Sequence, residues 1–398
     1  MKICVWFVTW GLFFGLIPAF PGGSSQEGNA SPTIPITSTN NVPVQWTREF
    51  STDFSIHSID FHEILSGGPA KDGIPSIDVP EPGVPSTAIS PTDRPVHTRP
   101  ATQETQVPPQ GRDNSYFETV NQAQDWIGSD ETVLVLSLDG ISRIYPLQIL
   151  MWHEIVNDWI GNKPVTVTWC PLCNTAVGFE RMLEDGTVLD FGTTGRLRYS
   201  NLLMYDRQTE SWWQQAEGLA VIGQYTGTKL AIVPLLTLPF RTAKKQYPEG
   251  LVLSRNTGYH RAYGTNPYQN YDSLNNPFLY QGPGFDTSRP PMERALVIFL
   301  DEKSVSVAYS VVEESGLIEI PSQGGTVLVL WHPGVASPLT TSSVATGPDR
   351  GSANAFFSRT TEGLTVSLQQ ELANSELLFR DFQTGSFGIL RAGLFPVH

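Results

Sequence analysis

Short apolar runs rich in β-branched residues occupy the middle of the chain, and they predict strands rather than long helices. The strands are expected at 133–138, 141–145 and 165–169. Asp139-Gly140 separates the first two strands, as is typical of a tight hairpin turn. From Pro146 to about Asp158 the chain is apolar nearly all round, which predicts a buried helix that has the proline in its first turn. A short helix is also predicted at 118–126.

The N-terminal part has a different pattern, with one apolar run followed by polar stretches. Residues 1–20 carry a single Lys before a long apolar run, which predicts a secretory signal peptide. We therefore expect a secreted or extracytoplasmic protein that meets a membrane only through an uncleaved signal segment. The predicted divisions are a signal peptide (1–23), a disordered tail (24–53), an ordered N-terminal segment (54–79), a Pro/Thr-rich insertion (80–114), a first repeat (115–290) and a second, degenerate repeat (291–398).

Three motifs of the first half recur in the same order in the second half, which predicts an internal repeat. Residues 133–139 resemble 295–301, residues 166–171 resemble 327–333, and residues 205–212 resemble 380–387. We expect an α+β, predominantly β fold of two diverged β-rich repeats around a pseudo-two-fold axis, with one buried helix before the cysteine pair. In this alignment His332 stands at the position of Cys170 and Val335 at that of Cys173, so the first half is expected to carry the chemistry.

Composition narrows the classes of function. The 25 basic and 39 acidic residues give a formal net charge of −14, which repels phosphate backbones, so no nucleic-acid partner is expected. Phosphate-binding glycine loops, the dinucleotide fingerprint, the zinc-protease helix motif and the serine-hydrolase elbow do not occur in the sequence. The absence of these motifs argues against most nucleotide-binding enzymes and the commonest hydrolases. We make no prediction of the oligomeric state.

The sharpest chemical signal is Cys170-Pro171-Leu172-Cys173, because Cys4, the third cysteine, lies in the predicted signal segment. Three roles compete for this pair. It is a thiol redox site, a metal site for Zn or Cu, or an inert disulfide that stiffens a turn. The segment after Cys173 is expected to be a turn or strand rather than the helix that opens at many redox sites. As a metal site the pair needs further ligands, for which the candidates are His153, His332 and His260.

The predicted buried helix carries two adjacent polar residues, His153 and Glu154. In a functional interpretation His153 is a metal ligand or a general base beside Cys170. In a structural interpretation both side chains belong to a hydrogen-bonded core network.

Other polar and aromatic residues are candidates for binding a small-molecule ligand. A module that binds a small molecule or a glycan through Trp- and Tyr-rich loops is the alternative to a cysteine-pair site, and a purely structural domain is a third hypothesis. The arginines on the predicted strand at 193–198 either bind an anion or pair with surface acids. The candidate binding residues are Lys71, Asp72, Glu154, Arg196, Arg198, Asp206, Arg207, Trp212, Trp213, His260, Arg261 and Tyr263.

The longest motifs resemble a known family. Residues 145–158 (YPLQILMWHEIVND), 170–176 (CPLCNTA) and 254–268 (SRNTGYHRAYGTNPY) are similar to the exported domain-of-unknown-function family 3179. Further similar segments are 67–75, 189–198 and 204–214. The resemblance covers about 54–79 and 115–390, and it implies no particular activity. The insertion at 80–112 departs from the family pattern and is expected to loop out of the fold.

Overall fold

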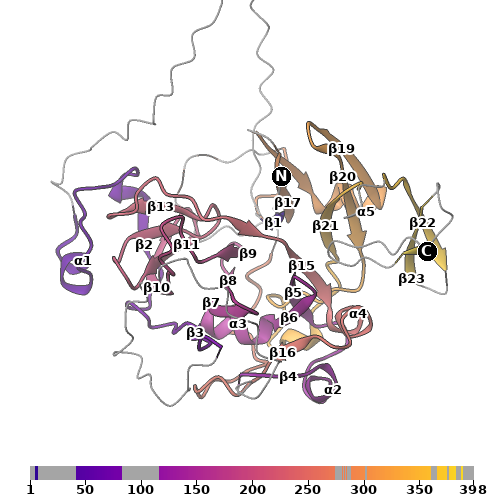
Figure 1. Ribbon diagram of the computed structural model, residues 1–398, viewed down its shortest axis with the longest axis horizontal. Helices are drawn as coiled ribbons and strands as arrows, with labels where there is room; N and C mark the ends of the chain where they lie inside the picture. Colours follow the sequence, from indigo (N-terminus) through magenta and orange to yellow (C-terminus); the bar gives the residue numbers. More distant parts are fainter. Residues whose placement is uncertain are drawn as a thin grey trace, which may run out of the picture.

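The computed structural model shows a chain built mainly of strands, which confirms the predominantly β fold class (Figure 1). The structure describes residues 5–7, 42–82, 116–273, 280, 282, 284, 288–300, 303–359, 365–373, 376–381 and 387–388. The predicted insertion, from residue 83 on, and most of the predicted signal segment lie outside the described residues. None of the described helices is long and apolar enough to cross a membrane.

Three five-stranded sheets form the part of the molecule that precedes residue 290. The first has the order β14 (Ile232–Val233), β9 (Thr175–Glu180), β8 (Lys163–Cys170), β7 (Ile155–Ile160) and β3 (Ile77–Asp78). The second has the order β15 (Leu235–Pro239), β5 (Thr132–Leu138), β6 (Ile141–Pro146), β16 (Leu251–Leu253) and β4 (Phe117–Thr119). The third has the order β13 (Leu219–Ile222), β12 (Trp212–Gln214), β11 (Asn201–Asp206), β10 (Phe191–Arg198) and β2 (Ile64–Ser66).

The three strands predicted around the hairpin and before the cysteine pair are present as β5, β6 and β8. Asp139 and Gly140 both have positive φ, as a two-residue hairpin between β5 and β6 requires. The short helix predicted at 118–126 is present only as α2 (Val120–Ala123), which β4 precedes.

The helix predicted from Pro146 to about Asp158 is wrong in its second half. Helix α3 (Leu147–His153) ends after seven residues, because Glu154 adopts a left-handed conformation with φ 56°. Ile155 and Val156 then begin strand β7, since β-branched side chains pack well on a pleated sheet. The helix itself is buried, as expected.

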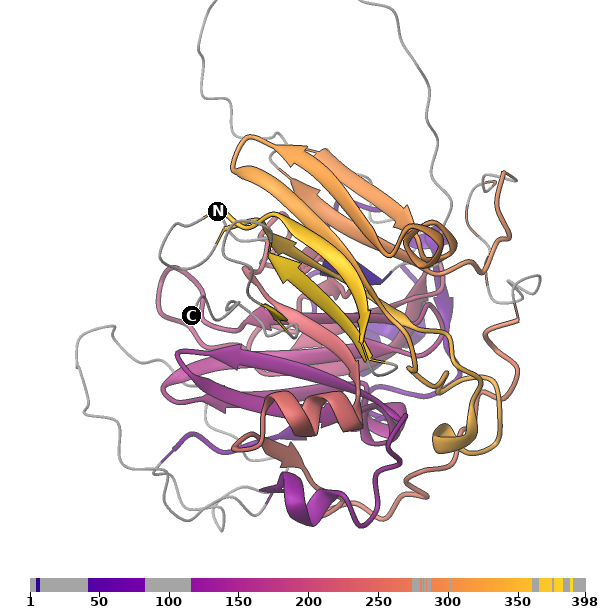
Figure 2. The same ribbon diagram turned by 90° about the vertical axis from the view of Figure 1, so that its right-hand side faces the viewer.

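The later part of the chain forms three three-stranded sheets, which lie against the first half (Figure 2). They have the orders β1 (Val5–Phe7), β17 (Ala295–Leu300), β18 (Lys303–Ala308); β19 (Leu317–Ser322), β20 (Gly325–His332), β21 (Ser352–Phe357); and β22 (Leu368–Ala373), β23 (Glu376–Asp381), β24 (Phe387–Gly388). Helix α5 (Tyr309–Ser315) connects β18 to β19, and α4 (Phe240–Gln246) follows β15. Short 3-10 helices occupy Phe61–Glu63 and Val344–Thr346.

The element order β5-β6-α3-β7-β8-β9 is the same as the order β17-β18-α5-β19-β20-β21. Each set has a hairpin, a seven-residue helix, a second hairpin and a third strand. The internal repeat and its pseudo-two-fold axis stay predictions, which this shared order supports.

One large hydrophobic core joins the two halves. It contains Leu134, Leu147 and Trp169 from the first half, and Tyr309 and Trp331 from the second. A separate core holds the N-terminal segment. It includes helix α1 (Val44–Glu49), which lies within the predicted disordered tail. Ordered structure therefore starts before residue 54, because the aromatic residues of α1 have a buried surface to pack on.

Candidate functional site

The cysteine pair lies in the short connection between strands β8 and β9. Cys170 is the last residue of β8 and is paired with Thr175, the first residue of β9. Asn174 closes the connection with φ 50°, a conformation that Asn tolerates better than most residues. A strand follows Cys173, as the sequence predicts, so no helix N-terminus acts on the thiols.

Both cysteines are buried thiols outside any disulfide, with 1% of Cys170 and 3% of Cys173 exposed. Burial raises the pKa of the Cys170 thiol well above its usual range. Although burial also opposes ionisation of Cys173, hydrogen bonds from Cys170, Thr175 and Asn201 lower the pKa of that thiol. The surroundings of the pair thus favour ionisation of Cys173 over that of Cys170.

A buried polar network holds the hydrogen-bond donor to Cys173 in place. The Asn201 side-chain amide donates to Cys173 Sγ at 3.1 Å and to the Gln215 side-chain oxygen at 2.7 Å. The Gln215 amide in turn donates to Thr168 Oγ1 at 2.8 Å and to the Thr175 carbonyl at 3.1 Å. The Asn201 donor is therefore oriented by residues of both sheets that meet at the site.

The hairpin between β10 and β11 approaches the pair through two strained residues. Tyr199 and Ser200 have φ of 51° and 64°, as a two-residue hairpin turn requires of its central residues. The Ser200 carbonyl lies 3.7 Å from Cys170 Sγ, and the next residue is Asn201. Left-handed residues other than glycine are costly, and here they gather around the two sulfurs.

Glu154 is the unexpected member of the site. Its side chain is 6% exposed, and no described residue donates a hydrogen bond to its carboxyl group. Burial raises the pKa of Glu154 to about 8, and the charge of Cys173 adds to this shift. A buried carboxyl group without hydrogen bonds is destabilising, so folding alone does not favour a glutamate here.

In the second half, the residue that ends helix α5 has a left-handed φ like that of Glu154. Gly316 follows α5 as Glu154 follows α3, and its φ is 69°. Both amides donate at 2.7 Å to a helical carbonyl, that of Leu150 for Glu154 and that of Val312 for Gly316. The Glu154 carbonyl accepts a hydrogen bond from the Trp169 amide, and the Gly316 carbonyl accepts one from the Trp331 amide. Glycine is the residue that this conformation favours, so Glu154 keeps a strained backbone at the cysteine pair.

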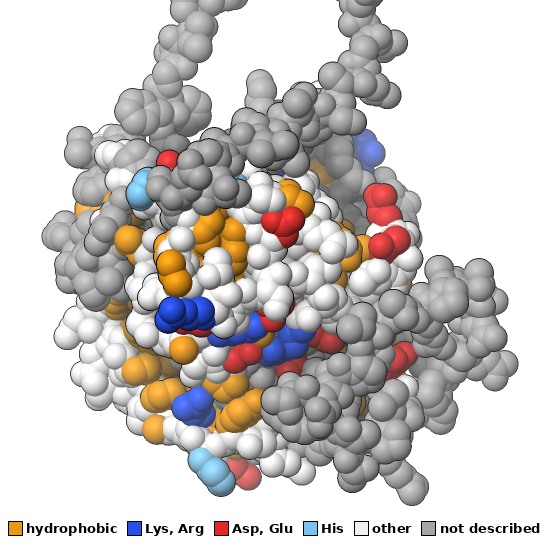
Figure 3. All heavy atoms as spheres, turned by 90° about the vertical axis from the view of Figure 1, so that its left-hand side faces the viewer, with side chains coloured by type: hydrophobic (Ala, Val, Ile, Leu, Met, Phe, Trp, Pro, Cys, Tyr) orange, Lys and Arg blue, Asp and Glu red, His pale blue; other side chains and the backbone are white. Residues whose placement is uncertain are grey.

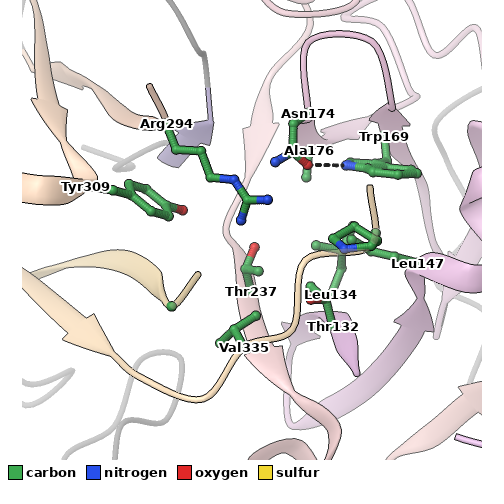
Figure 4. Close-up of a pocket in the computed structure, with 12 residues that line it drawn as sticks. Thr132, Leu134, Leu147, Trp169, Asn174, Ala176, Thr237, Arg294, Tyr309 and Val335 are labelled. Carbon is green, nitrogen blue, oxygen red and sulfur yellow. Dashed lines mark hydrogen bonds between the residues drawn. The ribbon is translucent and has the colours of Figure 1, made fainter. Parts of the chain in front are cut away.

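Two small cavities adjoin the pair, and the Arg294 side chain lines both of them. The first lies between the halves, where the Arg294 guanidinium extends from the Tyr309 side toward Asn174 and Thr237 (Figure 4). Asn174 there accepts a hydrogen bond from the Trp169 indole at 3.1 Å. The second cavity reaches Cys173 and is also lined by Leu172, Tyr271, Asp272 and Met292.

Arg294 is a partly buried cation, with 14% of its side chain exposed. Its guanidinium lies 3.0 Å from Ser337 Oγ and 3.6 Å from the Asp272 carboxylate. Burial lowers the pKa of Arg294 below its usual value. A guanidinium nevertheless keeps its proton in proteins, so the side chain is a cation. The cavity at Cys173 is therefore lined by a guanidinium and the carboxylate that pairs with it.

The histidines predicted as metal-ligating partners of the cysteine pair make contacts with other groups or are exposed. Both ring nitrogens of His153 are hydrogen-bonded, Nδ1 to the Pro75 carbonyl at 2.8 Å and Nε2 to the Tyr263 hydroxyl at 2.7 Å. Burial lowers the pKa of His153 to about 4, so the ring is neutral. His332 contacts Thr242 and the Pro333 carbonyl, and His260 is exposed. Within the described residues there is no group of three or more metal-ligating side chains.

The model of the family described as "Protein of unknown function (DUF3179)" matches residues 71–390, more than half of the chain. The chain belongs to this family. No curated protein and no solved structure matches it. The matched range contains the cysteine pair, Glu154 and Arg294, whereas helix α1 lies before the start of the DUF3179 match.

The predicted binding residues of the third sheet form ion pairs with the N-terminal segment. The pairs are Arg196–Glu49, Arg198–Glu63, Arg207–Asp72 and Lys71–Glu210. On the face seen in Figure 3, basic and acidic side chains likewise lie beside one another. These residues join the ordered N-terminal segment to β10 and the β11–β12 connection, and the structure does not bring them to the cysteine pair.

The remaining predicted residues are divided between the core and the surface. Trp212 and Trp213 are fully buried in different cores, so neither offers a face to a ligand. Asp206 accepts hydrogen bonds from the Thr209 amide at 2.6 Å and from the Trp213 indole at 2.8 Å, as expected of a turn residue. Arg261 is exposed, and Tyr263 contacts His153.

Three residues of the site carry no signal in the sequence analysis, namely Asn201, Gln215 and Arg294. Tyr268 and Tyr271 belong to a predicted Tyr-rich loop, and their pKa values are raised mainly by burial and also by the charges of the site. A polar Asn at the start of the apolar segment NLLMY was the one available hint. The others come from distant segments, which no local pattern connects to the cysteines.

Proposed function

We propose that Cys170 and Cys173 form a two-electron dithiol–disulfide redox site with Glu154 as its proton donor and acceptor. The observation that carries the proposal is the contact of two buried thiols, of which Cys173 is the one favoured to ionise. The thiolate is the reactive form of cysteine, and Asn201 is positioned to favour it on Cys173.

The roles of the two sulfurs follow from their surroundings. Cys173 lines a cavity and has the thiol whose pKa is lowered, so it is the nucleophile that meets the oxidant. Cys170 retains its proton and then attacks the Cys173 sulfur to form the S–S bond. The two electrons pass to an oxidant of the disulfide or hydroperoxide class, and the proton of Cys170 leaves with the reduced product.

Glu154 supplies the proton transfers that these steps need. With a pKa of about 8 the carboxyl group holds a proton at neutral pH and exchanges it readily. Its charge is coupled to both sulfurs. This role explains why a glutamate is kept at a position where the second half has Gly316.

The test is a redox titration of the full chain in thiol–disulfide buffers, followed by alkylation and peptide mass analysis to locate the oxidised cysteines. We expect reversible formation of the Cys170–Cys173 disulfide, with Cys4 unaffected. Glu154→Gln should slow oxidation at pH 7 by roughly 100-fold. Glu217→Gln, which removes an exposed carboxyl group, is the matched control and should leave the rate unchanged.

Two outcomes would contradict the proposal. A disulfide that forms and then resists reduction in the folded protein would assign the pair a structural role. Equal rates for Glu154→Gln and Glu217→Gln would remove Glu154 from the chemistry.

A soft metal ion is the second candidate for the same pair, because two sulfurs meet at one point. Thiolates select Cu(I), and two sulfurs suffice to bind it, whereas a four-ligand zinc site needs donors beyond the pair. His153 has both nitrogens engaged, so it is not the third ligand in this arrangement. Cu(I) titration of the reduced chain, with Cys173→Ser as control, tests this candidate by the stoichiometry of bound copper.

A further inference from the structure

We propose that the oxidant of this site is a small, uncharged hydroperoxide of about the size of hydrogen peroxide, which reaches Cys173 through the cavity lined by Arg294. This inference rests on the proposed redox function and names its substrate class. It follows from the size of the cavity, the burial of the sulfurs and the placement of the Arg294 guanidinium in the cavity wall.

Access to the sulfurs excludes large oxidants. Cys173 is 3% exposed, and the cavity that reaches it has a volume of about 10 Å³. A space of this size holds about one water molecule. Attack on a disulfide requires the three sulfurs to approach in line, which a peptide or glutathione disulfide cannot achieve at a sulfur enclosed in this way. Hydrogen peroxide is only one oxygen atom larger than water.

The cavity wall provides the charge that the reaction needs. Arg294 lines the cavity together with Cys173, and Ser337 and Asp272 hold its guanidinium in place. When a thiolate attacks a peroxide, negative charge develops on the departing oxygen. A fixed donor of positive charge in a site that excludes water stabilises that charge strongly.

The first step is balanced with Glu154 as the acid. The Cys173 thiolate attacks one oxygen of HO–OH, the S–O bond forms and the O–O bond breaks. The departing hydroxide takes the proton of the Glu154 carboxyl group and leaves as water. Sulfur is oxidised by two electrons to a sulfenic acid, and the peroxide is reduced by two.

The second step closes the disulfide. The Cys170 thiol gives its proton to the Glu154 carboxylate and attacks the Cys173 sulfur. The S–S bond forms, the S–OH bond breaks, and the hydroxide takes that proton to leave as a second water. One proton from solvent then restores the Glu154 carboxyl group, so two thiol groups, one of them ionised, one proton and one peroxide give one disulfide and two waters.

The experiment compares three oxidants on the reduced full chain: hydrogen peroxide, tert-butyl hydroperoxide and oxidised glutathione. The rate of Cys170–Cys173 disulfide formation is followed by timed alkylation and peptide mass analysis. We expect hydrogen peroxide to react at least about tenfold faster than the bulky hydroperoxide, and oxidised glutathione to give no measurable rate. Cys170→Ser should accumulate a sulfenic acid on Cys173, which a sulfenic-acid-specific reagent traps.

Two variants test the cavity and its cation separately. Leu172→Ala enlarges the cavity without touching the proposed chemistry, and it should raise the rate with tert-butyl hydroperoxide relative to hydrogen peroxide. Arg294→Gln removes the cation and should slow the reaction with hydrogen peroxide on the order of 100-fold. The rate at which dithiothreitol reduces the disulfide should stay unchanged in a folded Arg294→Gln protein.

The outcomes separate this inference from the function on which it rests. If oxidised glutathione oxidises the pair as fast as hydrogen peroxide, the substrate class is wrong and the redox function stands. If Leu172→Ala leaves the ratio of the two hydroperoxide rates unchanged, the route through this cavity is wrong. If no oxidant produces a reversible disulfide, the proposed redox function itself is wrong.

Discussion

At the scale of single residues, Glu154 shows most clearly how this chain departs from what folding alone favours. A left-handed backbone conformation costs a residue with a Cβ atom about 1–2 kcal/mol. Glu154 adopts it and also buries a carboxyl group to which no described residue donates a hydrogen bond. Two independent penalties at one residue, directly beside two thiols, are what a functional site produces and what a structural core avoids.

The pKa of Glu154 predicts how stability depends on pH. The pKa is raised from 4.5 to about 8 on folding, so the stability linked to this group is fully present below about pH 4.5. It is lost as the pH rises toward 8, with a slope on the order of 1 kcal/mol per pH unit. Urea unfolding of the wild type and Glu154→Gln between pH 5 and 8 measures the difference, and the variant should show the flatter profile.

A control variant separates strain from charge. Glu154→Gly removes both the buried carboxyl group and the backbone penalty, so it should raise the free energy of unfolding by about 1 kcal/mol or more at pH 7. It should also abolish the rapid oxidation of the pair. A Glu154→Gly protein that is less stable than the wild type would show that the carboxyl group has a structural role.

The dependence of stability on pH that is linked to His153 has the opposite sign. Its stability contribution is present above pH 6.5 and is lost as the pH falls through about 4.

At the scale of elements, the early end of α3 and the docking of α1 determine which surfaces meet. Because α3 stops at His153, the chain turns at once into β7, and this turn places Glu154 beside the end of β8. Helix α1 packs Trp46 and Phe50 on Trp212, with ring centroids 5.1 Å and 4.9 Å from it. The N-terminal segment therefore covers an outer face of the third sheet.

Docking of α1 predicts a measurable loss of stability. Trp46 is 3% exposed and contacts Phe54, Phe61 and Trp212, so Trp46→Ala should lower the free energy of unfolding by about 3–5 kcal/mol. Urea unfolding followed by circular dichroism measures this change. Val44→Ala, at a position that is 65% exposed, is the matched control on the same helix. Equal unfolding midpoints for the two variants would show that α1 does not pack as described.

At the scale of the whole molecule, the site depends on both halves of the chain. The largest core contains Trp169 from the first half and Tyr309 and Trp331 from the second. Arg294 belongs to the second half, yet it lines the cavity at Cys173. The site is thus assembled only when the halves pack together.

This shared core predicts cooperative unfolding. The described parts of both halves should unfold in one transition, because neither buries its apolar face alone. Thermal unfolding followed in parallel by far-ultraviolet circular dichroism and tryptophan fluorescence should give coincident curves. Two separate transitions would show that the halves are independent domains and that Arg294 is not held at the site by a common core.

The sequence by itself determined the strands around the cysteine pair, the hairpin at Asp139-Gly140 and the membership of the DUF3179 family. These features depend on neighbouring residues, whose propensities and spacing are visible in the chain. Only the tertiary structure decided that Glu154, Asn201 and Arg294 surround the sulfurs while His153 is engaged elsewhere. The physical reason is that long-range packing forced a left-handed residue at the end of α3 and brought distant strands together, and neither event leaves a periodic trace in the sequence.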